Sequence, residues 1–393
     1  MQSRFGQRQR GEEGRRHGKR MNCGSQIVHE PGQGELRRPR GPTGDGSRLS
    51  HLHSEASLGQ DDGGSQAIWT GSDDFSGGRH RTTPVIAHRN EKPIARATNL
   101  KTMESLQAEA TTTFALGGDL TVNRLGYGAM RITGPGIWGE PKDRNEARKV
   151  LQRALELGVN FIDTADAYGP EVSENIIAEA LYPYKKDLVI ATKGGFTRSG
   201  PNKWAEDGRP EYLRQCVEMS LRRLKLERID LYQLHRIDPK VPVEESLGAL
   251  KEFQDAGKIR HIGLSEVSPA EIERANKTVK IVSVQNQYNL SDRRHEKALK
   301  YCEQHKLAFI PWFPVAAGKL AKAGGPLDRA AKQHQATVAQ LSLAWLLHHS
   351  PVMLPIPGTS SVKHLEENMA AAKLHLSPEE WKAIESAAEK AKG

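Results

Sequence analysis

Eight short apolar segments, each followed by a longer amphipathic one, recur after Phe114 and constrain the fold more than any other feature of the chain. Short apolar runs that alternate with helical segments are typical of buried parallel strands. Eight such units predict a closed (β/α)8 barrel, and no GxGxxG motif follows the first strand to indicate an open dinucleotide-binding sheet. The predicted strands are Arg124–Met130, Asn160–Asp163, Leu188–Thr192, Asp230–His235, Ile259–Ser265, Ile281–Gln285, Ala308–Pro314 and Met353–Pro357.

The segments between these strands have the spacing of helices with one buried face. In Asn145–Leu157 the apolar residues recur every three and four positions, and Gly158 follows as a residue that tolerates the left-handed turn of a helix end. Tyr212–Leu224 and Pro242–Ala256 repeat the pattern. Ala336–Leu347 is apolar on more than one face, so we expect this helix to be well covered.

The first 102 residues differ in composition from the rest of the chain. They are rich in Gly, Arg, Ser and Pro, and their 17 Lys and Arg against 11 Asp and Glu supply six of the nine net positive charges. Such a segment buries too little apolar surface to offset its chain entropy, so residues 1–102 are expected to be a disordered basic extension. It could contact nucleic acid or another acidic partner, or it could lack a selected function, with Met103 as the true translation start. Residues 103–393 would then form the barrel domain, opened by a short β-hairpin at Phe114–Val122.

The composition also indicates a cellular setting. Cys23, Cys216 and Cys302 lie far apart without CxxC spacing, which favours reduced thiols over a disulfide framework or a zinc site. No run of about 18 apolar residues could span a membrane, and the N-terminus lacks the apolar core of a secretory signal. We therefore expect a cytoplasmic protein without a membrane or nucleic-acid partner. No heptad pattern indicates self-association, so a monomer is expected.

Four polar residues stand near the carboxyl ends of successive predicted strands, where a (β/α)8 barrel carries its function. Asp163 and Tyr168 follow the second strand, Lys193 the third and His235 the fourth. A carbonyl carbon that receives hydride drives negative charge onto its oxygen, which then needs a proton donor and stabilising dipoles. A neighbouring ammonium would ease proton release from a tyrosine, a carboxylate would hold that ammonium, and a neutral histidine could orient the carbonyl.

Each of these residues also has an interpretation that needs no chemistry. Asp163 and Lys193 could form a buried ion pair that closes the barrel. Tyr168 could serve packing alone, and His235 could be a hydrogen-bonded core histidine. Their joint placement on one rim favours the functional interpretation.

The order of motifs from Phe114 to about Leu376 resembles the aldo-keto reductase family. The resemblance implies an NADP(H)-dependent oxidoreductase that reduces aldehydes or ketones to alcohols. Tyr168 would be the general acid, assisted by Lys193 and Asp163, and His235 would orient the carbonyl of a small-molecule substrate. A cofactor-binding regulatory subunit with little turnover is the alternative. The matching segments are Asp163–Gly169 with Ser173-Glu174, Ala191–Gly195, Leu231–His235, Ile259–Ser265, Gln285–Asn289 and Ile356–Thr359.

The resemblance also assigns contacts to the cofactor. Ser265 and Gln285 match positions that hold the nicotinamide carboxamide, and Trp312 matches the aromatic residue that stacks under the ring. Glu266 stands where many members have Asn. The full set of expected cofactor-binding residues is Ala129, Met130, Ser265, Gln285, Trp312, Phe313, Pro314, Gly318, Lys319, Gly358, Thr359, Ser360, Ser361, His364, Glu367 and Asn368.

The turn Gly358–Ser361 opens a predicted helix, Val362–Ala372, whose N-terminal amides would face phosphate. A simple N-cap by Ser360 or Ser361 is compatible with this role. His364 stands where many members place an arginine for the 2′-phosphate of NADP. Because histidine is a weaker and pH-dependent phosphate partner, we expect NADP(H) to be preferred with NAD(H) tolerated.

Two tryptophans in loops after the strands, Trp138 and Trp204, could line the substrate pocket or could pack their own loops. The second loop, Phe196–Gly208, is rich in Gly and Pro and is expected to be mobile. The paired His and Asp ligands of a metal hydrolase are missing from the strand ends, so no metal site is expected.

Overall fold

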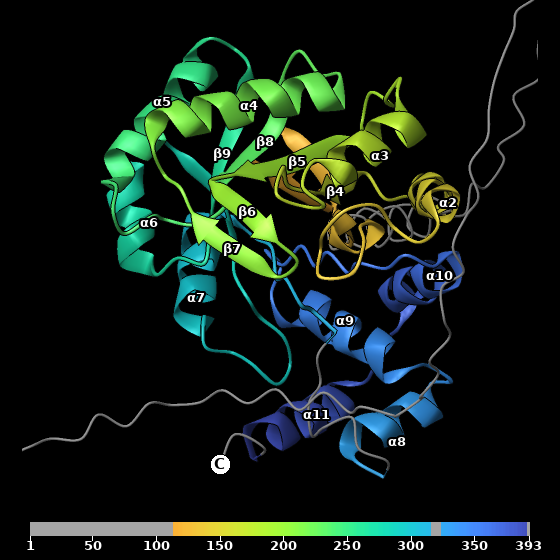
Figure 1. Cartoon of the computed structure of the whole chain (residues 1–393). Coiled ribbons are helices and arrows are strands. Elements are labelled where there is room, and N and C mark those ends of the chain that lie inside the picture. The colour runs from red at the N-terminus through yellow and green to blue at the C-terminus, as the bar shows by residue number, and fades with distance from the viewer. Residues whose placement is uncertain (1–112, 316–323, 391–393) are drawn as a thin grey trace, which may run out of the picture. The chain divides into compact units, whose positions relative to one another are not determined.

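A parallel sheet of seven strands organises the residues that the structure, a computed structural model, describes: 113–315 and 324–390 (Figure 1). The extension 1–102, Met103, Gly318 and Lys319 lie outside these ranges. Neighbouring strands are all parallel, in the order β11-β10-β9-β8-β5-β4-β3. The strands are β3 (Tyr127–Gly128), β4 (Phe161–Asp163), β5 (Val189–Gly194), β8 (Ile229–Leu234), β9 (Ile259–Ser265), β10 (Ile281–Gln285) and β11 (Ala308–Phe309).

The segment 353–357 contacts both edges of this sheet. The Leu354 amide donates a hydrogen bond to the Phe309 carbonyl of β11 at 2.8 Å, and the Gly126 amide donates to the Pro355 carbonyl at 3.0 Å. The segment is extended but is not a regular strand, as Met353–Pro357 was predicted to be. Pro355 and Pro357 have no N–H to donate, which limits ladder pairing here.

The interior of the sheet is shared by strands from both of its edges. One buried apolar cluster joins Phe161 of β4, Leu231 of β8, Ala308 of β11 and Leu354. A flat sheet would keep its first and last strands far apart, so this shared cluster shows that the sheet is curled. The same cluster includes Leu116, which closes one end of the interior.

Helices alternate with the strands up to residue 309 and cover the outer side of the sheet, whereas the helices Pro326–Gln333 and Pro378–Lys390 lie beyond the helix Val338–His349, away from the strands (Figure 1). The helices predicted in the sequence are present, most of them with ends shifted by one or two residues. The last of them ends earlier as an α-helix and continues as a 3₁₀ turn, η3 (Ala371–Lys373). The α-helices are α2 (Arg144–Glu156), α3 (Val172–Leu181), α4 (Pro210–Leu224), α5 (Val243–Asp255), α6 (Pro269–Asn276), α7 (Glu296–His305), α8 (Pro326–Gln333), α9 (Val338–His349), α10 (Val362–Ala370) and α11 (Pro378–Lys390).

Helix α9 shows how its sequence sets both its start and its burial. The Thr337 side chain accepts a hydrogen bond from the Gln340 amide while the Gln340 side chain accepts one from the Thr337 amide, which forms a capping box. All six residues from 341 to 346 are buried, so the prediction that this helix is covered on more than one face is confirmed.

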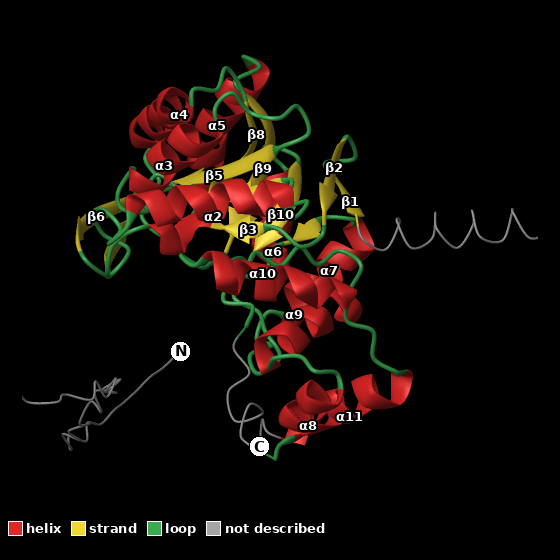
Figure 2. Cartoon of the chain, turned by 90° about the vertical axis from the view of Figure 1, so that its right-hand side faces the viewer, coloured by secondary structure: helices red, strands yellow, loops and turns green. Residues whose placement is uncertain are grey.

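Two antiparallel hairpins flank the sheet at opposite ends of its strands (Figure 2). The first pairs β1 (Thr113–Leu116) with β2 (Leu120–Asn123), and the second pairs β6 (Phe196–Gly200) with β7 (Lys203–Glu206). The second lies in the segment Phe196–Gly208, where the sequence pattern predicts no strands. Its Gly and Pro residues are typical of a loop, whereas Gly200 ends β6 and Pro201 lies in the turn of the hairpin.

Two further observations concern the cysteines and the possibility of a membrane span. Cys216 and Cys302 are buried, and each is a free thiol. None of the helices in ranges 113–315 and 324–390 combines the length and apolar character needed to cross a membrane.

Candidate active site

A cavity of about 500 Å³ opens where the carboxyl ends of β4, β8, β9 and β10 meet. It brings together residues predicted for catalysis and residues predicted for the cofactor. The lining residues are Gly128, Met130, Arg131, Ile137, Asp163, Tyr168, Phe196, Trp204, His235, Arg236, Ser265, Gln285, Trp312, Phe313, Pro314, Val315, Ile356, Pro357, Gly358 and Asn368.

Behind the cavity wall the Lys193 ammonium, which is not itself a lining residue, connects the carboxylate of Asp163 to the phenol of Tyr168. Its Nζ donates hydrogen bonds to Asp163 Oδ2 at 2.6 Å and to Tyr168 OH at 3.2 Å. Lys193 and Asp163 are both buried. Lys193 and Asp163 thus form the buried ion pair that was expected if they served structure alone. The same ammonium, however, also contacts Tyr168, a potential proton donor.

Two amide side chains fix the other oxygen of Asp163. Gln233 Nε2 donates to Asp163 Oδ1 at 3.0 Å, and Gln285 Nε2 donates to it at 2.8 Å. With Lys193 on its second oxygen, the carboxylate has partners on both sides. The position of the ammonium is therefore set by a hydrogen-bonded network rather than by one flexible contact.

Burial and charge act in opposite directions on the lysine and the tyrosine. Burial disfavours the Lys193 ammonium, but the Asp163 charge and the contacts with Asp163 and Tyr168 outweigh it and raise the lysine pKa. Burial raises the pKa of Tyr168 above its ordinary value even though the Lys193 charge lowers it. Tyr168 is therefore protonated at neutral pH, and Lys193 is placed to stabilise the phenolate as the proton leaves.

His235 lies edge-on to Tyr168, with 5.9 Å between the ring centroids. The ring is buried, and burial lowers its pKa well below the ordinary value, with the charges of Lys193, Arg236 and Arg198 acting in the same direction. Its Nδ1 has no hydrogen-bond partner among the described residues. The imidazole is therefore neutral at pH 7, and it is not the hydrogen-bonded core histidine of the alternative interpretation.

The predicted cofactor residues fall into three groups. Met130, Ser265, Gln285, Trp312, Phe313, Pro314, Gly358 and Asn368 line the cavity. Ala129, Thr359, Ser360, Ser361, His364 and Glu367 are not among its lining residues. Gly318 and Lys319 are the two that the structure does not describe.

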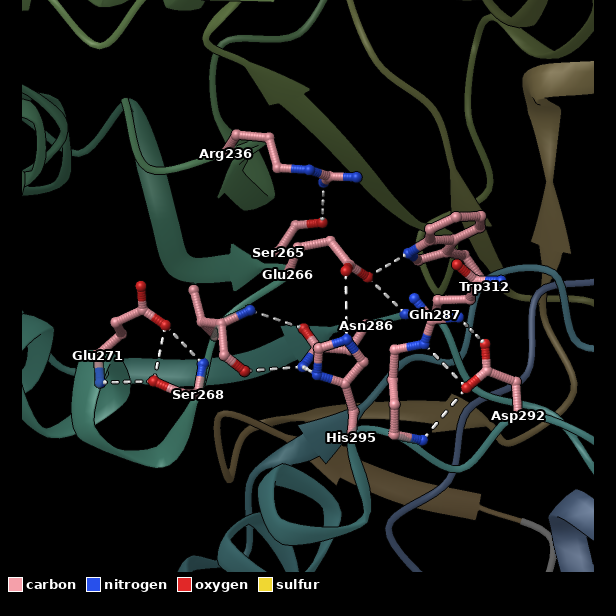
Figure 3. Close-up of polar contacts among 12 residues, drawn as sticks. Arg236, Ser265, Glu266, Ser268, Glu271, Asn286, Gln287, Asp292, His295 and Trp312 are labelled. Carbon is pink, nitrogen blue, oxygen red and sulfur yellow. Dashed lines mark hydrogen bonds and ion pairs between the residues drawn. The ribbon is translucent and has the colours of Figure 1, made fainter. Parts of the chain in front are cut away.

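Glu266 replaces the asparagine expected beside Ser265, and its carboxylate faces Trp312 (Figure 3). Its Oε1 accepts hydrogen bonds from Trp312 Nε1 at 2.7 Å and from the Gln287 amide at 2.6 Å, and its Oε2 lies 3.2 Å from His295 Nε2. Burial alone would raise the pKa of Glu266, but these three partners lower it to about 2. The carboxylate therefore anchors the aromatic residue predicted to stack under the nicotinamide.

Helix α10 begins after the turn that was predicted to bind phosphate. Ser361 occupies the N-cap position, yet its side chain makes no capping hydrogen bond. The Glu146 carboxylate of α2 accepts the Val362 amide instead, at 3.3 Å. A cap by the serine side chain is therefore not found, and the side chains of Ser360 and His364 are exposed.

The two tryptophans predicted near the substrate occupy different positions. Trp204, on β7, lines the cavity, with its ring 6.4 Å from the Tyr168 ring, whereas Trp138 is not a lining residue. The Arg198 guanidinium lies 3.5 Å from the Trp204 ring centroid and 5.6 Å from that of Trp138. The β6–β7 hairpin thus places Trp204 at the site, whereas Trp138 lies outside the cavity wall, beside Arg198 of the same hairpin.

Arg236 lines the cavity and was not predicted as a site residue. It directly follows His235, so its position beside a catalytic strand end was a signal that could have identified it. Phe196, which also lines the cavity, begins the segment Phe196–Gly208 that was expected to contribute to the substrate pocket. No group of three or more His, Cys, Asp or Glu side chains in the described part of the chain is arranged to hold a metal ion.

Comparison with known proteins places this chain in a family. The model of the aldo/keto reductase family matches residues 124–389. An uncharacterised oxidoreductase of Schizosaccharomyces pombe is 56% identical over 262 residues, which are 67% of this chain and 85% of that protein. Pyridoxine 4-dehydrogenase of Escherichia coli is 46% identical over 276 residues, which are 69% of this chain and 96% of that protein.

Solved structures give the same family. A glycerol dehydrogenase from Gluconobacter oxydans superposes with a TM-score of 0.65 at 28% identity, covering 72% of this chain and 96% of that one. An aldo-keto reductase from Klebsiella pneumoniae, in complex with NADP and acetate, superposes with a TM-score of 0.60 at 25% identity, covering 70% and 94%. The chain belongs to the aldo/keto reductase family and is an oxidoreductase.

Proposed function

We propose that this protein reduces aldehydes or ketones to alcohols with NADPH, on a closed (β/α)8 barrel that the β1–β2 hairpin precedes. The observation that carries the proposal is the contact of the buried Lys193 Nζ with Asp163 and Tyr168, two residues that line the cavity. The solved relative from Klebsiella pneumoniae with bound NADP supports the choice of cofactor.

The residues of the cavity fit a nicotinamide cofactor. The Ser265 hydroxyl and the Gln285 amide stand at the ends of β9 and β10, where they can meet a carboxamide. Trp312, fixed by Glu266, offers a flat face for the ring. Lys363 and His364, both exposed on the first turn of α10, would meet the 2′-phosphate, so we propose that NADP(H) is preferred and NAD(H) tolerated.

NADPH, when bound, supplies the hydride. Tyr168 gives its hydroxyl proton to the carbonyl oxygen, and the Lys193 ammonium stabilises the phenolate until a solvent proton restores it. His235, neutral because of its burial, donates an N–H to the same oxygen and orients it. Asp163 holds Lys193 in place throughout.

Pyridoxal, the 4-aldehyde of pyridoxine, is the first substrate to test because of the name of the Escherichia coli relative. Aromatic side chains in the cavity wall, Phe196 and Trp204 among them, suit a flat ring. The purified protein is expected to form pyridoxine and consume one NADPH per product. Binding of NADPH without reduction of pyridoxal or any simple aldehyde would overturn the proposal.

The proposal places the activity in residues 103–393 of a monomeric cytoplasmic protein. Deleting residues 1–102 is therefore expected to leave kcat and KM within about twofold of the full chain. A matched assay of the two proteins tests this, and a large loss of activity in the shorter one would contradict it. Gel filtration of both checks the expected monomer.

A further inference from the structure

Arg236 lies in the wall of the active-site cavity, immediately after His235 at the end of β8. Its Nη1 donates hydrogen bonds to the His235 carbonyl at 2.6 Å and to Ser265 Oγ at 2.8 Å. The guanidinium carbon also lies 5.5 Å from the centroid of the Phe196 ring. Of these contacts, Figure 3 draws the one with Ser265. Together they hold the planar group beside the residues proposed to orient the carbonyl.

Only one nitrogen of this guanidinium is engaged within the described residues. Both hydrogen bonds involve Nη1, and Arg236 forms no ion pair with any Asp or Glu of the described chain. Arg198, the other guanidinium near His235, differs because its Nε, Nη1 and Nη2 all donate to backbone carbonyls. Arg236 is therefore the one of the two that keeps donors available for a ligand.

The charges of Glu266 and Glu206 act on Arg236, but neither carboxylate forms an ion pair with it in the described chain. Asp163 is committed to Lys193, and Glu266 is committed to Trp312, Gln287 and His295. A half-buried cation without a carboxylate partner is costly, since it loses hydration without gaining an opposite charge. An anionic oxygen bound at Nε and Nη2 would offset that cost, and guanidinium geometry suits two parallel hydrogen bonds to a carboxylate.

We propose that Arg236 determines substrate class by binding an anionic oxygen group, such as a carboxylate, on the carbonyl compound that is reduced. The inference rests on the proposed reductase function and deepens it. It predicts that an aldehyde with such a group is reduced with a higher kcat/KM than a neutral aldehyde of the same shape. The benefit arises in binding, so it appears mainly in KM.

The test compares the three isomers of formylbenzoate with their methyl esters, which have a similar shape but no charge. Each is assayed with NADPH on the full-length wild type and on R236M, R236K and R209M. Arg209 is an exposed arginine paired with Asp207, so R209M removes the same charge outside the cavity. NADPH affinity and thermal unfolding of each variant are measured in parallel.

For at least one isomer, the wild type is expected to favour the carboxylate over its ester by about tenfold or more. R236M should bring this ratio close to one, R236K should keep part of it, and R209M should keep all of it. An equal rate on acid and ester in the wild type overturns the inference. So does a ratio that R236M leaves unchanged.

Two further outcomes separate substrate binding by Arg236 from a purely structural role. If R236M weakens NADPH binding and slows acid and ester equally, Arg236 acts by holding Ser265 and the inference is wrong. If the wild type reduces neither acids nor esters, the reductase function itself fails. Turnover of the neutral esters by the wild type therefore distinguishes failure of the Arg236 inference from failure of the proposed reductase function.

Discussion

The carboxylate of Glu266 accepts a hydrogen bond from the indole of Trp312, with 2.7 Å between Oε1 and Nε1. The same oxygen accepts the Gln287 amide, and Glu266 adopts a left-handed backbone conformation with φ of 58°. In this arrangement the side chain reaches the indole of Trp312. An acidic residue thus fixes the orientation of the proposed stacking platform.

Glu266→Ala is expected to raise the Kd for NADPH by about tenfold, because Trp312 and the Gln287 amide lose their acceptor. Leaving such groups unsatisfied also costs about 1–3 kcal/mol of unfolding free energy. Fluorescence titration with NADPH measures the first effect and urea unfolding the second. Glu271→Ala is the control, since Glu271 caps α6 with Ser268 and should affect stability alone. Equal NADPH affinity in wild type and Glu266→Ala would contradict this role.

The burial of His235 predicts a pH dependence of stability. The folded-state pKa lies well below 6.5, so below pH 6.5 the unfolded chain binds a proton that the folded chain does not. Stability therefore falls as pH decreases through that value, by about 1.4 kcal/mol between pH 7.5 and 5.5 for this group. His235→Gln should lose this part of the dependence. Unfolding free energies of both proteins at several pH values check it, and parallel pH profiles would refute it.

The burial of Asp166 predicts a pH dependence of stability opposite in sign to that of His235. Burial first, and the Glu174 charge second, raise the pKa of Asp166 from 3.8 to about 7, and its Oδ1 has no hydrogen-bond partner within the described residues. Between these values the folded state holds the proton more tightly, so stability falls as pH rises from about 4 to 7. At pH 8, Asp166→Asn is expected to be more stable than wild type by about 1–4 kcal/mol. Thermal unfolding of both proteins at pH 5 and pH 8 tests this. If the stability gain of Asp166→Asn is no larger at pH 8 than at pH 5, Asp166 does not titrate as proposed.

The close approach of Gly358 to Gly128 leaves no space for a side chain. A Cβ on Gly358 would lie 2.7 Å from the Gly128 carbonyl oxygen. Gly358→Ala is therefore expected to cost about 1–3 kcal/mol and to weaken NADPH binding by displacing the cavity wall. Gly248→Ala on α5, where no atom lies within 4 Å, should instead stabilise the protein by about 0.5–1 kcal/mol. Similar effects of the two substitutions would show that the contact is not tight.

The strand pattern was predictable wherever both neighbours of a strand can pair. The predicted strand Ile259–Ser265 matches β9 at both ends, and β9 lies between two regular strands. Arg124–Met130 and Ala308–Pro314 shrink to the two-residue strands β3 and β11. These are the two that face the segment 353–357, whose prolines lack the donors for a longer ladder. Apolar runs show which residues are buried, but pairing depends on a partner elsewhere in the chain.

The site was predictable in so far as strand ends determine it. Asp163, Lys193 and His235 come together because parallel strands present their carboxyl ends on one rim. The contact of Glu266 with Trp312 could not be foreseen, since it depends on a left-handed backbone at one position. The different positions of Trp138 and Trp204 depend on the β6–β7 hairpin, whose Arg198 donates hydrogen bonds to carbonyls of other loops far away in the sequence.

Replacement of Tyr168 by phenylalanine tests the central claim most directly. Reduction of pyridoxal and formylbenzoate esters is followed by NADPH consumption in wild type, Tyr168→Phe and the control Tyr184→Phe, whose hydroxyl binds the Leu224 carbonyl. We predict that Tyr168→Phe lowers kcat by about a hundredfold or more with NADPH affinity unchanged, and that Tyr184→Phe keeps the wild-type rate. A Tyr168→Phe protein that reduces these aldehydes at the wild-type rate would contradict the proposed role of Tyr168 as the proton donor.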